Sequence, residues 1–219
     1  MAIPAHDKAA TRQRLLESAG EVFAEHGFRA TTVRAICRHA GANIAAVNYH
    51  FGDKRALYAA VVRYAHGCAA DRHPIDLAGP RRQPPAQRLR AFVHGFLMRL
   101  LDQGRPAWHG KLMAREMVEP SGALDELVEK AIRPQFLLLS GIVTALVGEL
   151  DEVQLRRACI SVVCQCLFYH HARPVIVRLF PDLRLDQEEI AELTEHITAF
   201  TLNALAALYA KGRARGSRR

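Results

Sequence analysis

Residues 31–54 read TTVRAICRHAGANIAAVNYHFGDK and hold two short helical patterns on either side of a glycine turn. The first pattern follows a pair of threonines, which are good N-caps, and ends at Gly41. The second begins after Asn43, another N-cap residue, and ends before Gly52. Two short helices joined by such a turn predict a helix-turn-helix, whose second helix enters the major groove of DNA. Short helices with glycine turns also occur in other helical proteins, so the spacing alone leaves that ordinary interpretation open.

The second helical pattern, 44–50, has the composition expected of a DNA-reading helix. Its small Ala45 and Ala46 let the backbone approach DNA closely and can touch a thymine methyl group. Hydrogen-bonding groups follow on its outer face and at its end: Asn48, Tyr49 and His50. Lys54 combines a cation with a helix N-terminus, an arrangement that suits a phosphate. A second phosphate contact is expected at the start of the preceding helix, from Thr31, Thr32 and Arg34.

A longer stretch carries a family resemblance. It reads FAEHGFRATTVRAICRHAG at 23–41 and NYHFGDKRALY at 48–58. Over residues 8–65, without a gap, the chain resembles the DNA-binding domain of TetR-type repressors, and YHFGDK is highly specific for it. The resemblance implies an all-helical homodimer whose small N-terminal domain binds operator DNA and whose larger C-terminal domain binds an effector. By match to the family, Lys54 is the phosphate-contacting lysine, and the recognition helix carries Asn43, Ala45, Ala46, Asn48, Tyr49 and His50.

Two segments are similar to one branch of that family, the CecR-like regulators. They read NIAAVNYHFG at 43–52 and AREMVEPSGA at 114–123, with Pro134 further along the chain. This resemblance implies a regulator of transport or stress genes that responds to a small organic molecule, without identifying the molecule.

The composition of the 219-residue chain fits a folded, DNA-binding protein. Half of it is apolar, which excludes a disordered chain, and 30 Lys and Arg exceed 22 Asp and Glu to give a net charge of +8. A basic chain suits a polyanionic partner, although basicity alone also fits proteins that bind nothing anionic. The sequence has no Gly-x-Ser-x-Gly, His-Glu-x-x-His, P-loop or Rossmann pattern, so we expect neither an enzyme nor a cofactor.

The sequence also predicts a cytoplasmic protein. Its N-terminus lacks the apolar region of a secretory signal, and its five cysteines do not have the spacing of a disulfide framework. The longest apolar runs, 136–148 and 199–210, are shorter than the ~20 residues that span a bilayer, so no membrane partner is expected.

Helical periodicity extends along the chain and strand signals are nearly absent, which predicts an all-α fold. The prolines of 73–85 indicate a domain boundary, and Pro134 and Pro174 should each kink or split a long helix. The predicted parts are a three-helix helix-turn-helix domain at 1–52, a connecting helix at 53–73, an effector-binding and dimerisation bundle at 86–211, and a basic tail at 212–219.

A homodimer is expected from the last two long helical patterns, about 152–180 and 187–211. Their apolar side chains exceed what one small domain needs: Ile160, Val163, Leu167, Ile190, Leu193, Ile197, Phe200 and Leu205. Two helices from each copy would form a four-helix interface, and its two-fold symmetry would match a palindromic operator.

Five residues of otherwise apolar helices are expected to line the effector pocket: Trp108, Met113, Glu116, Gln165 and Tyr169. They would supply the mixture of apolar walls and few polar groups that such pockets need. For any one of them, ordinary core or surface placement is the more frequent outcome.

Cysteines and a histidine suggest an alternative function, a metal- or redox-sensing module. Cys159, Cys166 and His170 lie on one stripe of a helix, with Cys164 nearby, and thiolate and imidazole groups can bind Zn or Cu. Cysteines are also common where helices pack closely, and no Cys-x-x-Cys pair supports the metal. The sequence therefore favours packing over a metal site, and we expect no metal.

Overall fold

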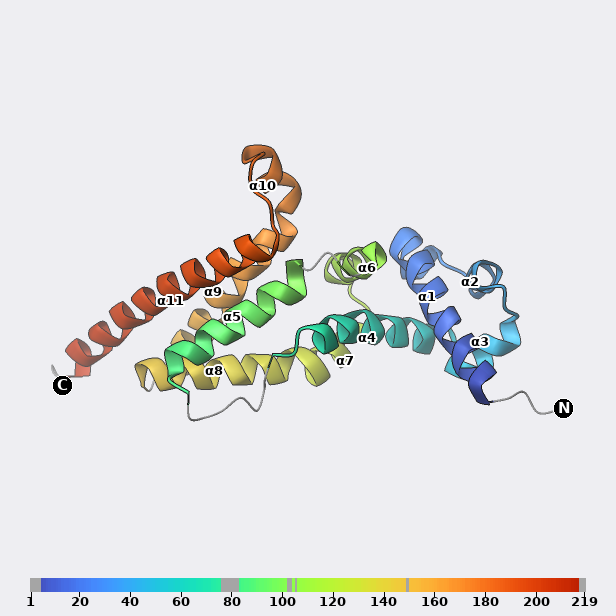
Figure 1. The fold of residues 1–219 in the computed structure, drawn as a ribbon. Helices are drawn as coiled ribbons and strands as arrows, with labels where there is room; N and C mark the ends of the chain where they lie inside the picture. Colours follow the sequence, from blue (N-terminus) through green and yellow to red (C-terminus); the bar gives the residue numbers. More distant parts are fainter. Residues whose placement is uncertain (1–4, 76–82, 102–103, 105, 149, 217–219) are drawn as a thin grey trace. The chain divides into compact units, whose positions relative to one another are not determined.

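A computed structural model describes residues 5–75, 83–101, 104, 106–148 and 150–216 of the chain, and these residues form helices and no strands (Figure 1). The predicted all-α class is therefore confirmed. In chain order the elements are α1 (Ala5–Ala30), α2 (Val33–Ala40), α3 (Ile44–Phe51), α4 (Lys54–Arg72), α5 (Pro85–Leu101), α6 (Ala107–Val118), α7 (Gly122–Leu127), a π-helical segment (Val128–Ile132), α8 (Arg133–Val147), α9 (Glu152–His171), α10 (Arg173–Leu179) and α11 (Gln187–Gly216).

The chain divides into two compact units. The first comprises Met1–Ala69 and Gly104–Lys130, and the second comprises Ala70–Gln103 and Ala131–Arg219. Helices α6 and α7 thus pack with the N-terminal helices, so the region predicted to bind effector and dimerise, 86–211, contributes to both packing units. The functional limits of the predicted domains stay a prediction.

The first unit is built around α1, which packs against α2, α3 and α6. Phe23 of α1 is fully buried, and its ring meets the ring of Tyr58 edge-on with centroids 4.8 Å apart. The indole of Trp108 in α6 lies close to the backbone of α1 at Gly20, where an added Cβ would come 2.3 Å from the ring. The close approach of α1 and α6 therefore requires glycine at this position.

The second unit is a bundle in which α5 packs against α8, α9 and α11 (Figure 1). Its core includes the fully buried side chains of Leu89, Leu97, Leu139, Val143 and Cys159. Pro174 lies in the first turn of α10, where a new helix starts as predicted, whereas Pro134 lies in the first turn of α8, which continues the π-helical segment without a break. A first-turn proline loses no intrahelical hydrogen bond, which is why a new helix can start at Pro174.

One helical stretch among the described residues, Gly122–Val147, is long and apolar enough to cross a membrane by length and composition alone. It is longer than the apolar run at 136–148, because α7, the π-helical segment and α8 follow one another without a break. A single stretch of this kind is weak grounds for a membrane protein, and core helices of soluble proteins pass the same test.

Candidate nucleic-acid interface

The predicted helix-turn-helix is formed by α2, α3 and the turn between them. Thr32 caps α2 by accepting a hydrogen bond from the Ala35 amide at 3.1 Å. Gly41 ends α2 in the left-handed conformation, with φ 59° and ψ 37°, a region that favours glycine. Asn43 caps α3 by accepting from the Ala46 amide at 2.9 Å. Local hydrogen bonds of three caps thus fix the angle at which α3 leaves the turn.

Helix α3 has one buried side and one exposed side. Val47 is fully buried in the first unit, whereas Ala45, Asn48 and Tyr49 are exposed. The Tyr49 side chain is 70% exposed, which is unusual for an aromatic residue that has no partner surface. Small, amide and aromatic side chains therefore share one accessible face of the helix that the sequence predicts to read DNA.

The remaining predicted DNA contacts differ in their exposure. Arg34 is exposed near the start of α2, and Ala46 and His50 are half-buried on α3. Thr31 is 2% exposed, and its hydroxyl donates a hydrogen bond to the Gly27 carbonyl oxygen at 2.7 Å. Thr31 therefore stabilises the end of α1, and its side chain is too buried to contact a phosphate without a local rearrangement.

Lys54 starts α4, directly after Asp53, whose side chain accepts from the Ala56 amide at 2.8 Å. Its ammonium lies 4.6 Å from the centre of the Phe28 ring and donates to the Arg29 carbonyl oxygen at 3.4 Å. The ammonium group carries three donors, so two remain for a phosphate. The contacts with Phe28 and Arg29 hold the charge at the N-terminal end of α4.

Two cations that the sequence analysis missed lie beside α3. Lys8 of α1 reaches the Tyr49 hydroxyl at 3.5 Å, and its ammonium is 5.7 Å from the centre of that ring. Arg12, one helical turn further along α1, lies over the Phe51 ring at 5.2 Å. Their i, i+4 spacing was visible in the sequence, but the packing of α1 against α3 is what places them next to the recognition helix.

The five predicted effector residues are divided between the two units. Gln165 and Tyr169 line a groove of about 790 Å³ in the second unit. Trp108, Met113 and Glu116 belong to α6 in the first unit and do not line that groove. Trp108 packs in the core against α1, and Met113 is half-buried.

Glu116 is a fully buried carboxylate whose two oxygens both accept hydrogen bonds. The Tyr58 hydroxyl donates to Oε2 at 2.6 Å, and the amide and hydroxyl of Ser121 donate to Oε1 at 2.8 Å each. Burial and the Glu116 carboxylate raise the pKa of Tyr58 far above its ordinary value. Glu116 therefore ties α4 to the start of α7, and a ligand would have to break these bonds to reach it.

The neighbouring Arg115 forms hydrogen bonds with the backbone of α1 just before the helix is interrupted at Gly27. Its guanidinium donates to the carbonyl oxygens of Ala24 at 2.9 Å and Glu25 at 2.7 Å. These carbonyls precede Gly27, whose φ of 78° and ψ of 169° interrupt the helix. Arg115 thus satisfies carbonyl groups that the interruption leaves without helical partners, which joins α6 to α1 by polar as well as apolar contacts.

The environment of Cys159 and Cys166 is that of packed core residues. Cys159 and Cys166 are fully buried, and burial raises the pKa of Cys159 and raises that of Cys166 to about 12. A thiol with a raised pKa stays protonated at neutral pH and is a weak ligand and nucleophile. Across the part of the chain that the structure describes, no group of three or more His, Cys, Asp or Glu side chains is placed to hold a metal.

A helix-turn-helix with an exposed second helix and flanking cations, joined to a helical bundle, is typical of DNA-binding transcriptional regulators. Two family models match the chain: "Bacterial regulatory proteins, tetR family" at residues 15–61, and "HTH-type transcriptional dual regulator CecR, C-terminal domain" at residues 85–205. The chain therefore belongs to the TetR family of regulators, in its CecR-like branch. The members of this family are regulators rather than enzymes, which confirms the expectation that the chain is not an enzyme.

Individual relatives agree with this assignment. The HTH-type transcriptional dual regulator CecR of Shigella flexneri is 30% identical over an alignment of 154 residues that covers 63% of this chain and 65% of the relative. The HTH-type transcriptional repressor AcnR of Corynebacterium glutamicum is 42% identical over 64 residues, which are 29% of this chain and 34% of the relative. The matched region thus spans less than two thirds of either relative.

Solved structures show the same fold. A TetR-like transcriptional regulator from Rhodococcus sp. RHA1 superposes with a TM-score of 0.65 at 18% identity, covering 92% of this chain and 99% of the other. HlyIIR, a hemolysin II transcriptional regulator, gives a TM-score of 0.59 at 19% identity, covering 87% and 98%.

Proposed function

We propose that the chain is a ligand-responsive repressor that binds a palindromic operator as a homodimer in the cytoplasm. The observation that carries the DNA-binding part is the exposed face of α3, where Ala45, Asn48 and Tyr49 lie together. Lys8, Arg12 and Lys54 add cations from α1 and α4. Side chains on α3 would distinguish base edges, and the flanking cations would bind phosphates and set the register.

A homodimer is supported by an apolar stripe on the outer faces of α9 and α11. Ile160 of α9 is 49% exposed and Phe200 of α11 is 60% exposed. Not all of the apolar residues that the sequence predicts at the interface are exposed. Four of them are buried within the second unit: Ile190, Leu193, Ile197 and Leu205. These four stabilise the subunit itself, so contact with a second copy falls to the exposed residues.

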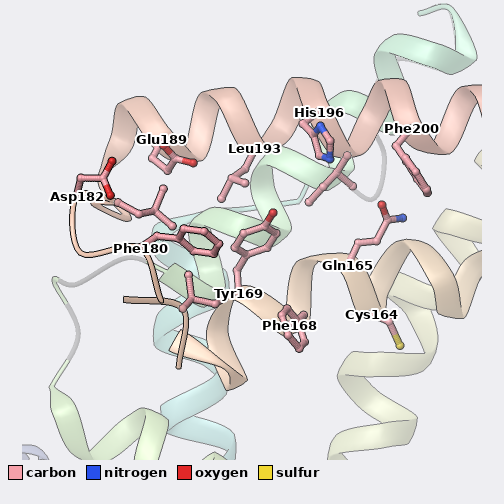
Figure 2. A pocket seen from close by; sticks show the side chains of 13 residues that line it. Cys164, Gln165, Phe168, Tyr169, Phe180, Asp182, Glu189, Leu193, His196 and Phe200 are labelled. Carbon is pink, nitrogen blue, oxygen red and sulfur yellow. The ribbon is translucent and has the colours of Figure 1, made fainter. Parts of the chain in front are cut away.

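An effector would release DNA only if it bound the DNA-incompetent arrangement of the dimer more tightly than the competent one. Of the predicted effector residues, Gln165 and Tyr169 line a groove that a small molecule can enter. Trp108 and Glu116 are engaged in the packing of the first unit. Two of the five predicted effector residues therefore lie at a groove of the second unit, whose lining also includes Phe200 of the proposed dimer face (Figure 2).

The experiment that tests the proposed function is selection of bound sequences from random DNA by the purified chain. We expect a shared palindrome whose half-sites are centred about one helical turn, roughly 10 base pairs, apart. Affinity should fall steeply with salt, because each neutralised phosphate releases counterions. Selected sequences without two-fold symmetry, or binding that ignores salt, would contradict the proposal.

Lys54→Ala provides a variant for the same assay. It should weaken binding to all sequences alike and reduce the slope of log affinity against log salt by about 0.9. Asn48→Ala is the matched comparison, since loss of a base contact should change which sequence is preferred. If Lys54→Ala leaves the salt slope unchanged, Lys54 is not a phosphate contact.

A further inference from the structure

The first unit contains a small crevice where the end of α1 meets α4 and the loop after α6, which we call the α1–α6 crevice. Its volume of about 340 Å³ is at the lower end of the range of sites that bind small organic molecules. Every residue that lines it belongs to the first unit. The crevice is therefore separate from the residues of α9 and α11 that we assign to the dimer face.

One wall of the α1–α6 crevice is apolar. The rings of Phe28 and Tyr58 both line it, and their centroids are 5.0 Å apart. Val118, the last residue of α6, also lines it with a side chain that is 81% exposed. An exposed valine next to two aromatic rings leaves apolar surface that a small organic group can cover.

Arg115 supplies a positive charge to the crevice. Its half-buried guanidinium is held against α1 by the carbonyl oxygens of Ala24 and Glu25. Gly27 makes room for it, because an added Cβ at Gly27 would come 3.0 Å from Nη1 of Arg115. The two bonds use two of the five N–H donors of the guanidinium, which leaves three for a ligand. Both acceptors are neutral, so the contacts that hold the guanidinium in place do not cancel its charge.

Two exposed charges of opposite sign also line the crevice, Arg29 near the end of α1 and Glu119 after α6. The buried Glu116 does not line it, and Oε2 of that carboxylate accepts from the Tyr58 hydroxyl at 2.6 Å. The described residues that line the crevice therefore carry two cations against one carboxylate. Since water screens the two exposed groups, the half-buried Arg115 determines the sign of the ligand charge that is favoured.

We propose that the α1–α6 crevice binds a small organic carboxylate, with its anionic group against Arg115 and its apolar group against Phe28 and Val118. A guanidinium presents planar, directed N–H donors that match the two oxygens of a carboxylate. The apolar wall favours an organic group over a hydrated inorganic anion, because covering that wall removes apolar surface from water.

The test uses the full chain without DNA and three probes. Benzoate and benzamidinium share a planar shape and carry opposite charges, and acetate keeps the carboxylate without the ring. Binding is followed by the NMR shifts of the Phe28 and Val118 backbone amides at an ionic strength of about 0.15 M. We expect benzoate to bind, and the other two probes to bind on the order of tenfold more weakly. Benzamidinium or acetate binding as well as benzoate would overturn the proposal.

Variants locate the binding. Arg115→Lys keeps the charge but loses the planar donors, and should weaken benzoate binding by about fivefold. Because Arg115 also holds α1, two exposed positions provide an independent test: Arg29→Gln should weaken binding about twofold and Glu119→Gln should strengthen it about twofold. The matched control is Lys111→Gln, an exposed cation of α6 that does not line the crevice. Unchanged affinity in both Arg29→Gln and Glu119→Gln would overturn the proposal.

The crevice borders a predicted phosphate contact. The Lys54 ammonium lies 4.6 Å from the centre of the Phe28 ring and donates to the Arg29 carbonyl oxygen. A bound carboxylate would attract this ammonium and so weaken DNA binding, a consequence that rests on the proposed function. Selection of DNA without any probe tests that function separately. A chain that binds benzoate but selects no DNA keeps this site, whereas one that selects a palindrome and ignores benzoate loses it.

Discussion

Replacing Glu116 with alanine should destabilise the first unit, because this carboxylate is an internal structural group rather than a ligand contact. It is 0% exposed and accepts one hydrogen bond from Tyr58 and two from Ser121. Alanine would leave the Tyr58 hydroxyl, on a side chain only 4% exposed, without its acceptor. It would also leave the first turn of α7 without the group that binds its N-cap residue.

The magnitude follows from these three contacts. A buried donor that loses its partner costs roughly 1–3 kcal/mol, and Tyr58 is such a donor. The two Ser121 donors are part-buried and can turn to water, so they add about 1 kcal/mol together. The total is about 3 kcal/mol, which corresponds to a decrease in melting temperature of roughly 6–12 °C for a chain of this length.

Thermal unfolding followed by circular dichroism measures this decrease. The control is Glu119→Ala, which removes an exposed carboxylate from the C-terminal end of the same helix and should change the melting temperature little. Tyr58→Phe should lower the free energy of unfolding by about 1–2 kcal/mol. The double variant should lower it by less than the sum of the two single variants, because each single change already removes the same Tyr58–Glu116 hydrogen bond. A melting temperature of Glu116→Ala equal to that of the wild type would refute the reasoning.

Three further outcomes are expected. Lys8→Ala should reduce the salt slope of DNA binding by about 0.9, whereas Lys111→Ala, an exposed cation on α6, should leave it unchanged. Ile160→Asp should convert the dimer into a 24.4 kDa monomer in sedimentation equilibrium, because it places a charge in the apolar stripe; a persistent dimer would place the interface elsewhere. At pH 8 a thiol reagent should modify the exposed Cys164 and spare the buried Cys166, whose pKa is raised to about 12, until the protein unfolds.

Much of the fold could be predicted because the signals are local. A cap such as Asn43 acts on an amide three residues away, and Gly41 is needed for a conformation that its own backbone adopts. Pro134 and Pro174 act through a donor that proline itself lacks. Each of these features depends on a few consecutive residues, so the sequence predicts it before any tertiary contact is known.

The candidate site could be predicted only in part, because some of it depends on packing between distant segments. The exposed face of α3 follows from helical periodicity around Val47. The approach of Lys8 to Tyr49 joins residues 41 positions apart, and that of Glu116 to Tyr58 joins residues 58 apart. A carboxylate on an apolar helix can face a ligand or a buried phenol, and the sequence pattern of α6 is the same in both cases.

The dimer face illustrates the same limit in the second unit. Helix α11 carries apolar residues on two stripes, and a hydrophobic pattern does not say which stripe faces the core of its own subunit. The bundle assigns Ile197 and Leu205 to that core and leaves Phe200 exposed between them. The Phe200 side chain stays 60% exposed although its ring stacks on His196 of the same helix, so most of its apolar surface is left for another partner. The total apolar content of α11 therefore does not identify the residues that can contact a second copy or a ligand. They are identified by their own exposure once the packing of the bundle has buried their neighbours on the helix.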